Sequence, residues 1–369
     1  MRFLPLLFLP VILSCQRDAF GVPPDVRQLW ESDNPLRAIP PGPLGSGIDL
    51  SRLPAPPTSE RVRLGRWLFF DARLSRDGTL SCASCHQPAH AFSSPFPVAT
   101  GIDGQRGTRK IPTIVNLAVI RERPRNFEAE PRPGPFFWDG RAPSLERQAL
   151  EPIANPIEMG SSHAQMEQTL SRIDGYRPYF ARAFGDAQIT RERVARALAD
   201  YERTRMSGNS PFDRWRTGTD DRAVSAAVKR GFDLFAGKAQ CARCHPGPLF
   251  TDAGFHNLGI GWNAATRTFA DEGRHAVTKG SVMQADPGTF KTPTLREAAR
   301  RAPYMHDGSI ATLREVVEFY NRGGNPNPDL DNAIAPRRLS PDEIDAIVAF
   351  LKSLDGEGWQ DVAPSHFPK

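Results

Sequence analysis

The sequence has only five cysteines, no basic tract and, beyond its first residues, no long apolar run. Lys and Arg outnumber Asp and Glu by 47 to 42, and these charges are spread along the chain, which argues against a nucleic-acid-binding protein. No stretch after residue 14 approaches the ~20 apolar residues that cross a membrane. With 369 residues, the chain is long enough for two domains of ordinary size.

Two copies of one short motif hold four of the five cysteines. Residues Cys82–His86 and Cys241–His245 both have the form C-x-x-C-H, the attachment motif of a c-type haem. A redox-active cysteine pair or half of a zinc site needs no histidine directly after the second cysteine, and neither explains the duplication. The motifs therefore predict two haem c groups bound covalently by Cys82, Cys85, Cys241 and Cys244, with His86 and His245 as axial iron ligands.

The first residues have the pattern of an export signal. A short apolar run up to Leu13 follows Met1-Arg2 and is too short to span a membrane. We expect residues 1–14 to be a signal peptide and Cys15 to be the lipidated residue of the mature chain; an ordinary cleavage site a few residues later is the alternative. Either route predicts a periplasmic protein, attached to a membrane only through the lipid.

The rest of the sequence divides into a proline-rich arm and two similar halves. Residues 15–58 are rich in proline and predict an extended tether or wrapping arm that is not part of a core. Arg63–Phe69 is similar to Lys229–Phe235 and each precedes a haem motif, so we expect a duplicated unit, with cytochrome c-like domains at 59–212 and 213–369. Strand patterns are scarce, which predicts an all-α fold with long haem-wrapping loops and helices at Glu60–Phe70, Ile189–Met206, Ala311–Tyr320 and from Ser340 to Leu354.

The sixth ligand of each iron separates an electron carrier from an enzyme, because an iron with an open face can react with peroxide. The first half offers His90, but this residue follows His86 too closely to reach the opposite haem face. Met159 and Met166 fit core positions better than ligand positions. We therefore expect an open first haem. A non-enzymatic carrier with two six-coordinate irons is the alternative.

These features resemble those of the bacterial dihaem cytochrome c peroxidase and MauG family, over a region from Arg61 to Leu354. The two haem motifs stand in the family's order, and they are joined by three further family motifs at Phe137–Arg141, Lys291–Arg296 and Ala302–Gly308. The resemblance implies two cytochrome c-like lobes with Trp138 between the two haems.

The same resemblance implies roles for three residues on the open side of the first haem. Glu158 corresponds to the general acid and base for peroxide cleavage. Gln148 would orient peroxide or water. Pro152 would lie over the iron without binding it. Residues 100–107, where many dihaem peroxidases carry a distal histidine, contain none, so the first haem should be open without reductive activation.

The second haem departs from the peroxidases at its sixth ligand. Tyr320 stands where they carry a methionine, and this substitution resembles the MauG-like branch, which includes MauG and MbnH. A phenolate ligand stabilises ferric and higher iron states, whereas methionine raises the reduction potential. Met305 is the rival ligand, and a tyrosine at this helical spacing is otherwise a core residue.

Two family features carry over poorly. The inter-lobe calcium site uses an asparagine where this chain has Lys110, and an ammonium group cannot bind calcium. Only the backbone carbonyls of Arg301 and Pro303 remain as ligands, with Asn116 as a displaced alternative, so we expect calcium to bind weakly or not at all. Ala239 stands where MauG has the tryptophan of its route to the protein substrate, which makes methylamine dehydrogenase an unexpected partner.

The sequence thus predicts an exported, MauG-like dihaem oxidoreductase. It would use hydrogen peroxide to bring its haems to a high oxidation state and would oxidise an aromatic residue of a secreted or periplasmic partner protein at long range. One alternative is a cytochrome c peroxidase that reduces peroxide with electrons from a small donor protein. The other is the dihaem electron carrier.

Overall fold

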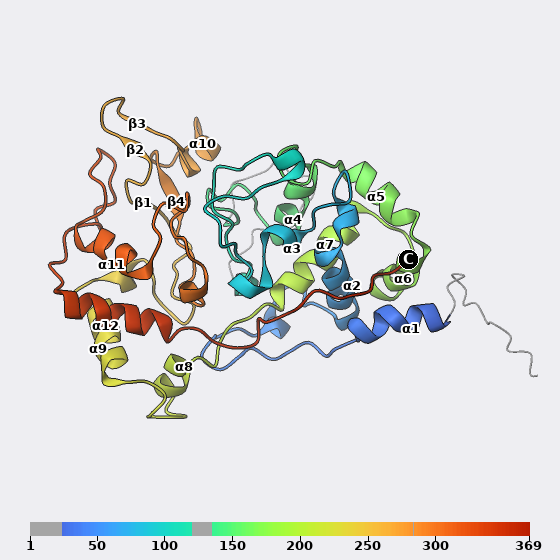
Figure 1. Ribbon diagram of the computed structural model, residues 1–369, viewed down its shortest axis with the longest axis horizontal. Coiled ribbons are helices and arrows are strands. Elements are labelled where there is room, and N and C mark those ends of the chain that lie inside the picture. Colours follow the sequence, from blue (N-terminus) through green and yellow to red (C-terminus); the bar gives the residue numbers. More distant parts are fainter. Residues whose placement is uncertain (1–23, 120–134, 283) are drawn as a thin grey trace, which may run out of the picture.

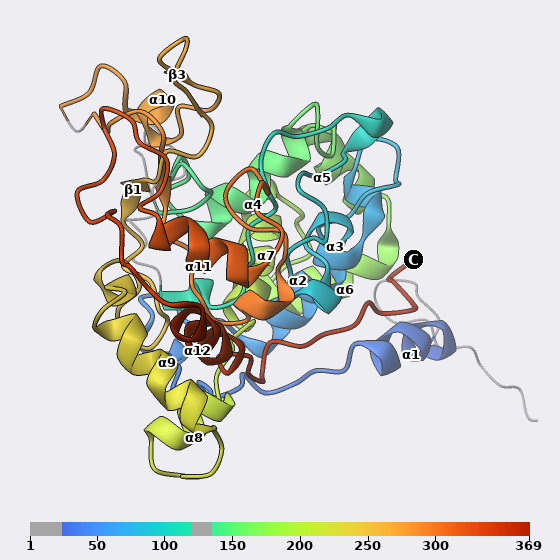
Figure 2. The same ribbon diagram turned by 60° about the vertical axis from the view of Figure 1, so that its left-hand side comes forward.

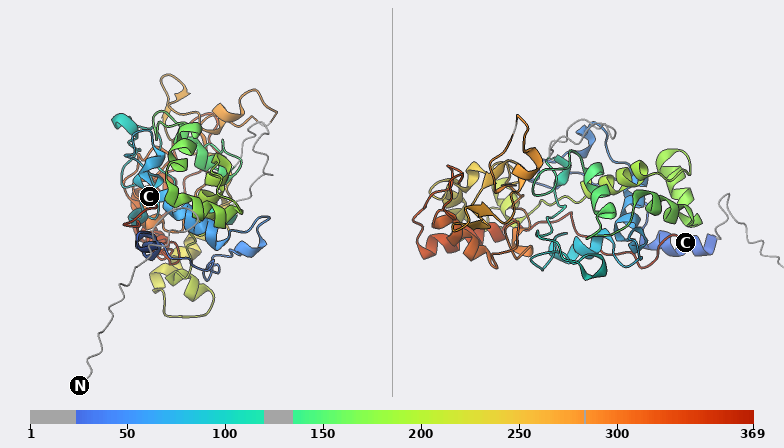
Figure 3. Two further views of the ribbon diagram at one scale, coloured as in Figure 1. Left: turned by 90° about the vertical axis from the view of Figure 1, so that its right-hand side faces the viewer. Right: turned by 90° about the horizontal axis from the view of Figure 1, so that it is seen from above.

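The computed structural model describes residues 24–119, 135–282 and 284–369, which form two helical lobes side by side (Figures 1 and 3). The first lobe contains α2 (Ser59–Phe70), α3 (Cys82–Cys85), α4 (Leu145–Ala154), α5 (His163–Ser171), α6 (Arg177–Phe184) and α7 (Arg191–Arg203). The second lobe contains α8 (Pro211–Arg216), α9 (Ala226–Ala236), α10 (Arg274–Thr278), α11 (Leu313–Asn321) and α12 (Pro341–Lys352). Single 3-10 turns occur in the connections, at Leu50–Arg52, Ala72–Leu74, Pro88–His90, Ile102–Gly104, Leu117–Val119, Asp174–Tyr176, Cys241–Arg243 and Ala298–Arg300.

Two small antiparallel sheets lie in the second lobe beside these helices. β1 (Phe255–Asn257) pairs with β4 (Thr289–Lys291), and β2 (Trp262–Asn263) pairs with β3 (Thr268–Phe269). The lobes are thus mainly helical with long loops, as the sequence predicts, but a strictly all-α description is wrong in this region. The strands were missed because they are only two or three residues long, too short for a period-2 pattern.

The helices begin at the capping residues that the sequence offers. Ser340 and Glu343 form a capping box with Pro341 in the first turn, as predicted, and α12 ends at Lys352 rather than Leu354. Thr312 caps α11, which therefore begins at Leu313 instead of Ala311. The predicted helix Ile189–Met206 is shorter at both ends, since α7 runs from Arg191 to Arg203. Thr190 is the capping residue at its start.

Each lobe has one helix pair that crosses at a glycine. Gly65 of α2 lies against α7, where an added Cβ would stand 1.9 Å from the Ala197 carbonyl oxygen. Gly231 of α9 lies against α12 in the same way, 2.0 Å from the Ala346 carbonyl oxygen. Figure 2 shows α9, α11 and α12 packed together. Both glycines occupy the same place in the repeated segments before the haem motifs, so the two halves share their packing as well as their sequence.

Gly231→Ala is expected to destabilise the protein by about 1–3 kcal/mol, because the methyl group must push α9 away from the α12 backbone. Urea unfolding of the holoprotein measures the effect. Gly107→Ala is the control, since its nearest neighbour would be 3.9 Å away, and it should shift stability by less than about 0.5 kcal/mol. Equal effects of the two substitutions would contradict the close crossing.

The sequence suggested an arm that is extended and not part of a core, but the structure shows that part of the arm is helical and buried. It contains α1 (Pro24–Asp33), and Trp30 of that helix is buried in the first lobe, where its indole N–H donates to the Tyr179 hydroxyl at 2.7 Å. Further along, Ile48 and Leu50 are buried against residues of both lobes. The arm therefore contributes to the cores that it wraps.

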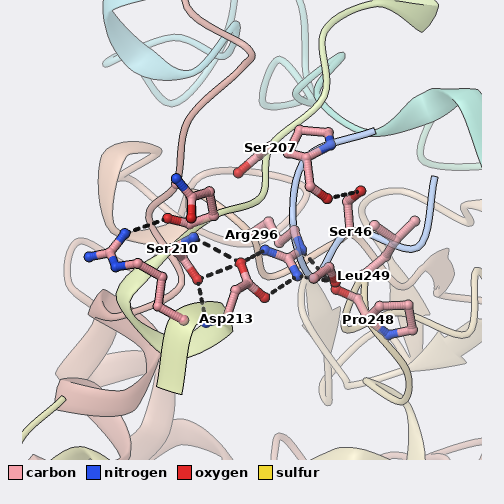
Figure 4. Close-up of polar contacts among 12 residues, drawn as sticks. Ser46, Ser207, Ser210, Asp213, Pro248, Leu249 and Arg296 are labelled. Carbon is pink, nitrogen blue, oxygen red and sulfur yellow. Dashed lines mark hydrogen bonds and ion pairs between the residues drawn. The ribbon is translucent and has the colours of Figure 1, made fainter. Parts of the chain in front are cut away.

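A buried ion pair fixes the arm to the second lobe (Figure 4). The Arg296 guanidinium donates to both carboxylate oxygens of Asp213 at 2.8 Å, and it also donates to the carbonyls of Gly45 in the arm and Pro248. Ser210 completes the shell of Asp213 through its hydroxyl and its N–H. Both charged side chains are almost fully buried, so this pair is a fixed junction rather than a surface contact.

Residues 355–369 run from α12 back across the first lobe, as the dark red segment of Figure 1 shows. Asp361 accepts hydrogen bonds from Arg66 and from the Tyr201 hydroxyl. Trp359 is buried in the first-lobe core, and the Lys369 carbonyl accepts from the Gly175 N–H at 2.8 Å. The first lobe is therefore closed by a segment that follows the second lobe in sequence.

The predicted signal peptide and Cys15 lie outside the described residues. None of the helices in residues 24–119, 135–282 and 284–369 combines the length and hydrophobicity that a bilayer-spanning segment requires.

Candidate haem sites

The second motif lies at the wall of a largely apolar cavity. Cys241, Cys244 and His245 follow α9 on a 3-10 turn and line this cavity. Apolar side chains from α9, α11, α12 and the loops between them form most of its surface, among them Phe235, Leu249, Leu295, Val317 and Leu351. A large flat ring bound through the two thiols would fit such a wall.

Both motif histidines are held in the same way. The Nδ1–H of His86 donates to the Phe92 carbonyl at 3.1 Å, and that of His245 donates to the Phe250 carbonyl at 2.8 Å. Both phenylalanines have positive φ, 54° and 52°, an uncommon backbone conformation that turns each carbonyl toward its ring. Each Nε2 is left free to bind iron.

The ionisation of the motif side chains fits haem attachment. Burial lowers the pKa of both histidines, that of His245 to about 4, so each imidazole is neutral and can act as a ligand. Burial raises the pKa of Cys85 to about 11 and that of Cys241 to about 12. A reactive redox pair needs a lowered thiol pKa, so the redox alternative loses support.

The two rival ligands of the second haem, Tyr320 and Met305, both line the cavity of His245. Tyr320 comes from α11, and burial raises its pKa, with a smaller contribution from the charges of Cys241 and Cys244. Met305 lies in a loop and has a backbone φ of 72°. The fold therefore brings both side chains to the cavity.

Basic side chains at the cavity wall match the two propionates that a haem carries. Lys291 and Arg301 both line the cavity. Burial alone lowers the pKa of Lys291 to about 8, which fits an ammonium group with no carboxylate beside it. Arg301 donates to the backbone carbonyls of Thr294 at 2.6 Å and Arg296 at 3.0 Å. The residues of the second lobe therefore fit a bound haem.

Trp138 lies between the lobes, as the family resemblance implies. Its indole N–H donates to the Lys110 carbonyl at 2.7 Å, and its own carbonyl accepts from the Lys291 N–H at 2.8 Å. The tryptophan also lines the cavity of the second lobe. The indole is thus fixed by Lys110, and the backbone of Trp138 is fixed by Lys291.

The three residues expected on the open side of the first haem lie in or just after α4. Gln148 and Pro152 stand one turn apart on this helix, and the side-chain oxygen of Gln148 is buried without a hydrogen-bond partner. Asn155 donates to Glu158 at 2.8 Å, and burial raises the pKa of Glu158. The Glu158 charge also contributes to the raised pKa of Cys85, which places it close to the first motif.

One polar cluster was not singled out from the sequence. His256 forms hydrogen bonds with Asp252 at 3.0 Å and Asp331 at 2.6 Å. The Cys244 sulfur lies within 4.8 Å of the ligand atoms of His256 and Asp252. Haem attachment uses the Cys244 sulfur, so the cluster then keeps too few ligands for a closed metal site. Asp252 and His256 come from one segment, with His256 in β1, whereas Asp331 comes from a loop 75 residues further along, so the sequence does not reveal the cluster.

Comparison with known proteins supports this arrangement. Residues 59–221 match the family model described as "Di-haem cytochrome c peroxidase", and residues 228–355 match the model described as "Cytochrome c". The chain is 41% identical to the methylamine utilization protein MauG of Methylorubrum extorquens over 82% of this chain and 80% of that protein. It is 35% identical to the cytochrome c551 peroxidase of Nitrosomonas europaea over 82% of each chain.

A solved structure shows the same fold. A MauG-like protein associated with microbial copper homeostasis superposes with a TM-score of 0.73 and 30% identity, over 88% of this chain and 95% of that one. The matches extend over both lobes and both haem motifs. The chain belongs to the di-haem cytochrome c peroxidase and MauG family, which makes it a peroxidase-type oxidoreductase with two c-type haems.

Proposed function

We propose that this protein uses hydrogen peroxide to oxidise an aromatic side chain of a partner protein that does not enter the haem sites. The observation that carries the proposal is the position of Tyr320, which lines the same cavity as His245. A His/Tyr-ligated iron suits the storage of oxidising equivalents better than the acceptance of electrons from a donor. The 41% identity to a MauG protein favours the same branch.

The bound haems would supply the redox-active iron that reacts with peroxide. Hydrogen peroxide takes up two electrons and two protons and leaves as two waters, so the partner must give up two electrons in total. The Glu158 carboxylate would take a proton from one peroxide oxygen and deliver it to the leaving oxygen. The unpartnered Gln148 oxygen would accept a hydrogen bond from the peroxide O–H. The Pro152 ring is a hydrocarbon with no atom that can bind iron, so it would lie over the metal without occupying the open position.

The indole of Trp138 would carry charge between the lobes. Its indole N–H donates to the Lys110 carbonyl, and the Trp138 backbone carbonyl accepts from the Lys291 N–H. Ala239, which lines the second cavity, offers no aromatic ring for a further step to the surface there. The partner protein would therefore dock at another face of the second lobe.

We further propose that the protein is exported to the periplasm, with Cys15 as its lipid-bearing residue. Haem c is attached outside the cytoplasm, which agrees with the apolar run that ends before Cys15. A partner protein would then be secreted or periplasmic as well.

Reduction of peroxide by a small donor protein is the second candidate function. Met305 lines the same cavity as Tyr320, and a His/Met haem has the higher potential that accepts electrons readily. The 35% identity to a cytochrome c551 peroxidase fits this alternative.

The two functions can be separated with the purified dihaem protein. Peroxide is added together with either reduced cytochrome c or the secreted proteins encoded beside this chain. The proposal expects peroxide-dependent mass changes on Trp or Tyr residues of one secreted protein, and slow oxidation of cytochrome c. Rapid steady turnover of cytochrome c without any such protein modification would favour the peroxidase.

Tyr320→Phe is expected to change the low-spin ferric spectrum of the second haem, because the oxygen ligand is lost. It should also shorten the time for which the peroxide-treated protein keeps its oxidising equivalents, while small ligands still bind the first haem. Met305→Leu is the matched control from the same cavity and should leave the spectrum unchanged. The reverse result would assign the ligand to Met305 and favour the peroxidase.

A further inference from the structure

Lys110 is a buried lysine at the junction of the two lobes. Its side chain is 3% exposed, and its ammonium group donates to the backbone carbonyls of Ser94, of Phe96 at 3.1 Å and of Ala302 at 3.5 Å. Ser94 and Phe96 belong to the loop after the first haem motif, whereas Ala302 belongs to the second lobe. The three N–H donors of one ammonium thus meet three carbonyl oxygens from both lobes.

Among residues 24–119, 135–282 and 284–369, no carboxylate pairs with the charge of Lys110. Burial and the positive charge of Arg301 together lower its pKa to about 8, and no acidic side chain acts in the other direction. Backbone carbonyl dipoles are therefore what stabilise the ammonium. A group of carbonyl oxygens around one positive charge is also the surrounding that a hard metal ion such as Ca²⁺ prefers.

A calcium ion does not fit beside this side chain. The resemblance suggests the backbone carbonyls of Arg301 and Pro303 as calcium ligands. These two residues stand on either side of Ala302, and the Lys110 ammonium already donates to the Ala302 carbonyl. Two cations cannot share one set of carbonyl oxygens at this distance without strong repulsion. The residue that would have to supply an oxygen supplies a positive charge instead.

We propose that the Lys110 ammonium is a built-in cation that joins the two lobes in place of a bound divalent metal. The lobe junction of this chain is then complete without calcium and insensitive to chelators. The inference does not rest on the proposed function, since it concerns the junction alone.

The same residue positions Trp138. The Lys110 carbonyl accepts from the indole N–H at 2.7 Å, and the Lys110 N–H donates to the His306 carbonyl of the second lobe at 2.7 Å. The Lys110 side chain therefore binds the carbonyls of the loop and of Ala302, whereas its backbone binds Trp138 and His306. If the ammonium is removed, the loop of Ser94 loses its link to Ala302, and the backbone hydrogen bond to His306 alone holds the carbonyl that binds the indole.

The test compares the dihaem protein with its Lys110→Met and Lys110→Asn variants, in EGTA and in calcium chloride. The native protein should melt at the same temperature in both and should show no calcium binding by isothermal titration calorimetry. Lys110→Met should melt at least about 5 °C lower in both. Lys110→Asn should melt lower in EGTA and recover in calcium, because its amide oxygen adds a ligand, with one ion bound per chain more tightly than about 1 mM.

Lys279→Met removes an exposed lysine and serves as the control, which should melt like the native protein. Recovery in calcium is the decisive readout, because a purely packing role of Lys110 would not create it. If EGTA lowers the melting temperature of the native protein, or if Lys110→Met melts like the native protein, the proposal is wrong. If neither Lys110 variant folds, a lower melting temperature of the native protein in EGTA would still overturn the proposal.

Discussion

Replacing Glu158 with glutamine is expected to slow the reaction of the dihaem protein with hydrogen peroxide by about 100- to 10,000-fold, the usual contribution of a general acid and base. The glutamine side chain keeps the shape and the hydrogen bond to Asn155 but cannot exchange a proton. Stopped-flow measurement of the haem absorbance after peroxide addition gives the rate constant.

The pH dependence makes this prediction sharper. Burial raises the pKa of Glu158 above its ordinary value of 4.5. Removal of a peroxide proton needs the ionised carboxylate, so the native rate should rise with pH through a midpoint above 4.5. The Glu158→Gln variant should lose this dependence.

Glu151→Gln is the matched control for this experiment. Glu151 lies on α4 close to Glu158 and forms an ion pair with Arg141 at 2.8 Å, so its replacement also removes one negative charge from this region. Its rate should stay within a few fold of the native rate. A Glu158→Gln rate as high as that of the control would assign the proton transfer to another group.

Arg296→Met is expected to produce the largest loss of stability, about 3–5 kcal/mol, because it leaves Asp213 as a buried carboxylate without its partner. Burial alone would raise the pKa of Asp213, but the Arg296 guanidinium and the hydrogen bonds from Ser210 together outweigh burial and hold the pKa below its usual value. The arm would also lose the hydrogen bond at Gly45. Urea unfolding followed by circular dichroism measures the change.

Arg52→Met provides the comparison within the same arm. Arg52 pairs with Asp49 at 3.0 Å, but its side chain is 86% exposed. Exposed pairs of this kind contribute about 0–1 kcal/mol, so this variant should unfold almost like the native protein. Similar losses in the two variants would show that the arm does not depend on the buried pair.

The parts of the structure that the sequence predicted are those with local signals. The haem motifs are fixed by five consecutive residues, and the capping residues of α12 specify where that helix begins. The duplicated unit follows from the repeated segment before each motif. Such features depend on neighbours in the chain, so their structure can be inferred without knowledge of the fold.

The parts that could not be predicted depend on residues far apart in the sequence. Tyr320 and Met305 both look suitable as ligands, and both reach the same cavity, so their spacing alone does not decide between them. From the sequence, Lys110 indicated only that one ligand of the family's calcium site is missing. Its contact with Ala302, 192 residues away, is formed by the packing of the lobes. The buried part of the arm was missed for the same reason, because its composition is that of a linker while Trp30 and Leu50 pack against residues far along the chain.

The return of residues 355–369 to the first lobe affects the order in which the protein can mature. During synthesis, the amino-terminal half emerges before its closing segment exists, so Trp359 and Asp361 cannot yet cover α2 and α7. The first C-x-x-C-H motif thus stays in an unfinished lobe until residues 355–369 have been made. We therefore expect haem insertion into that lobe to precede its final closure, and an excised amino-terminal half to remain open to proteases even when it carries its haem.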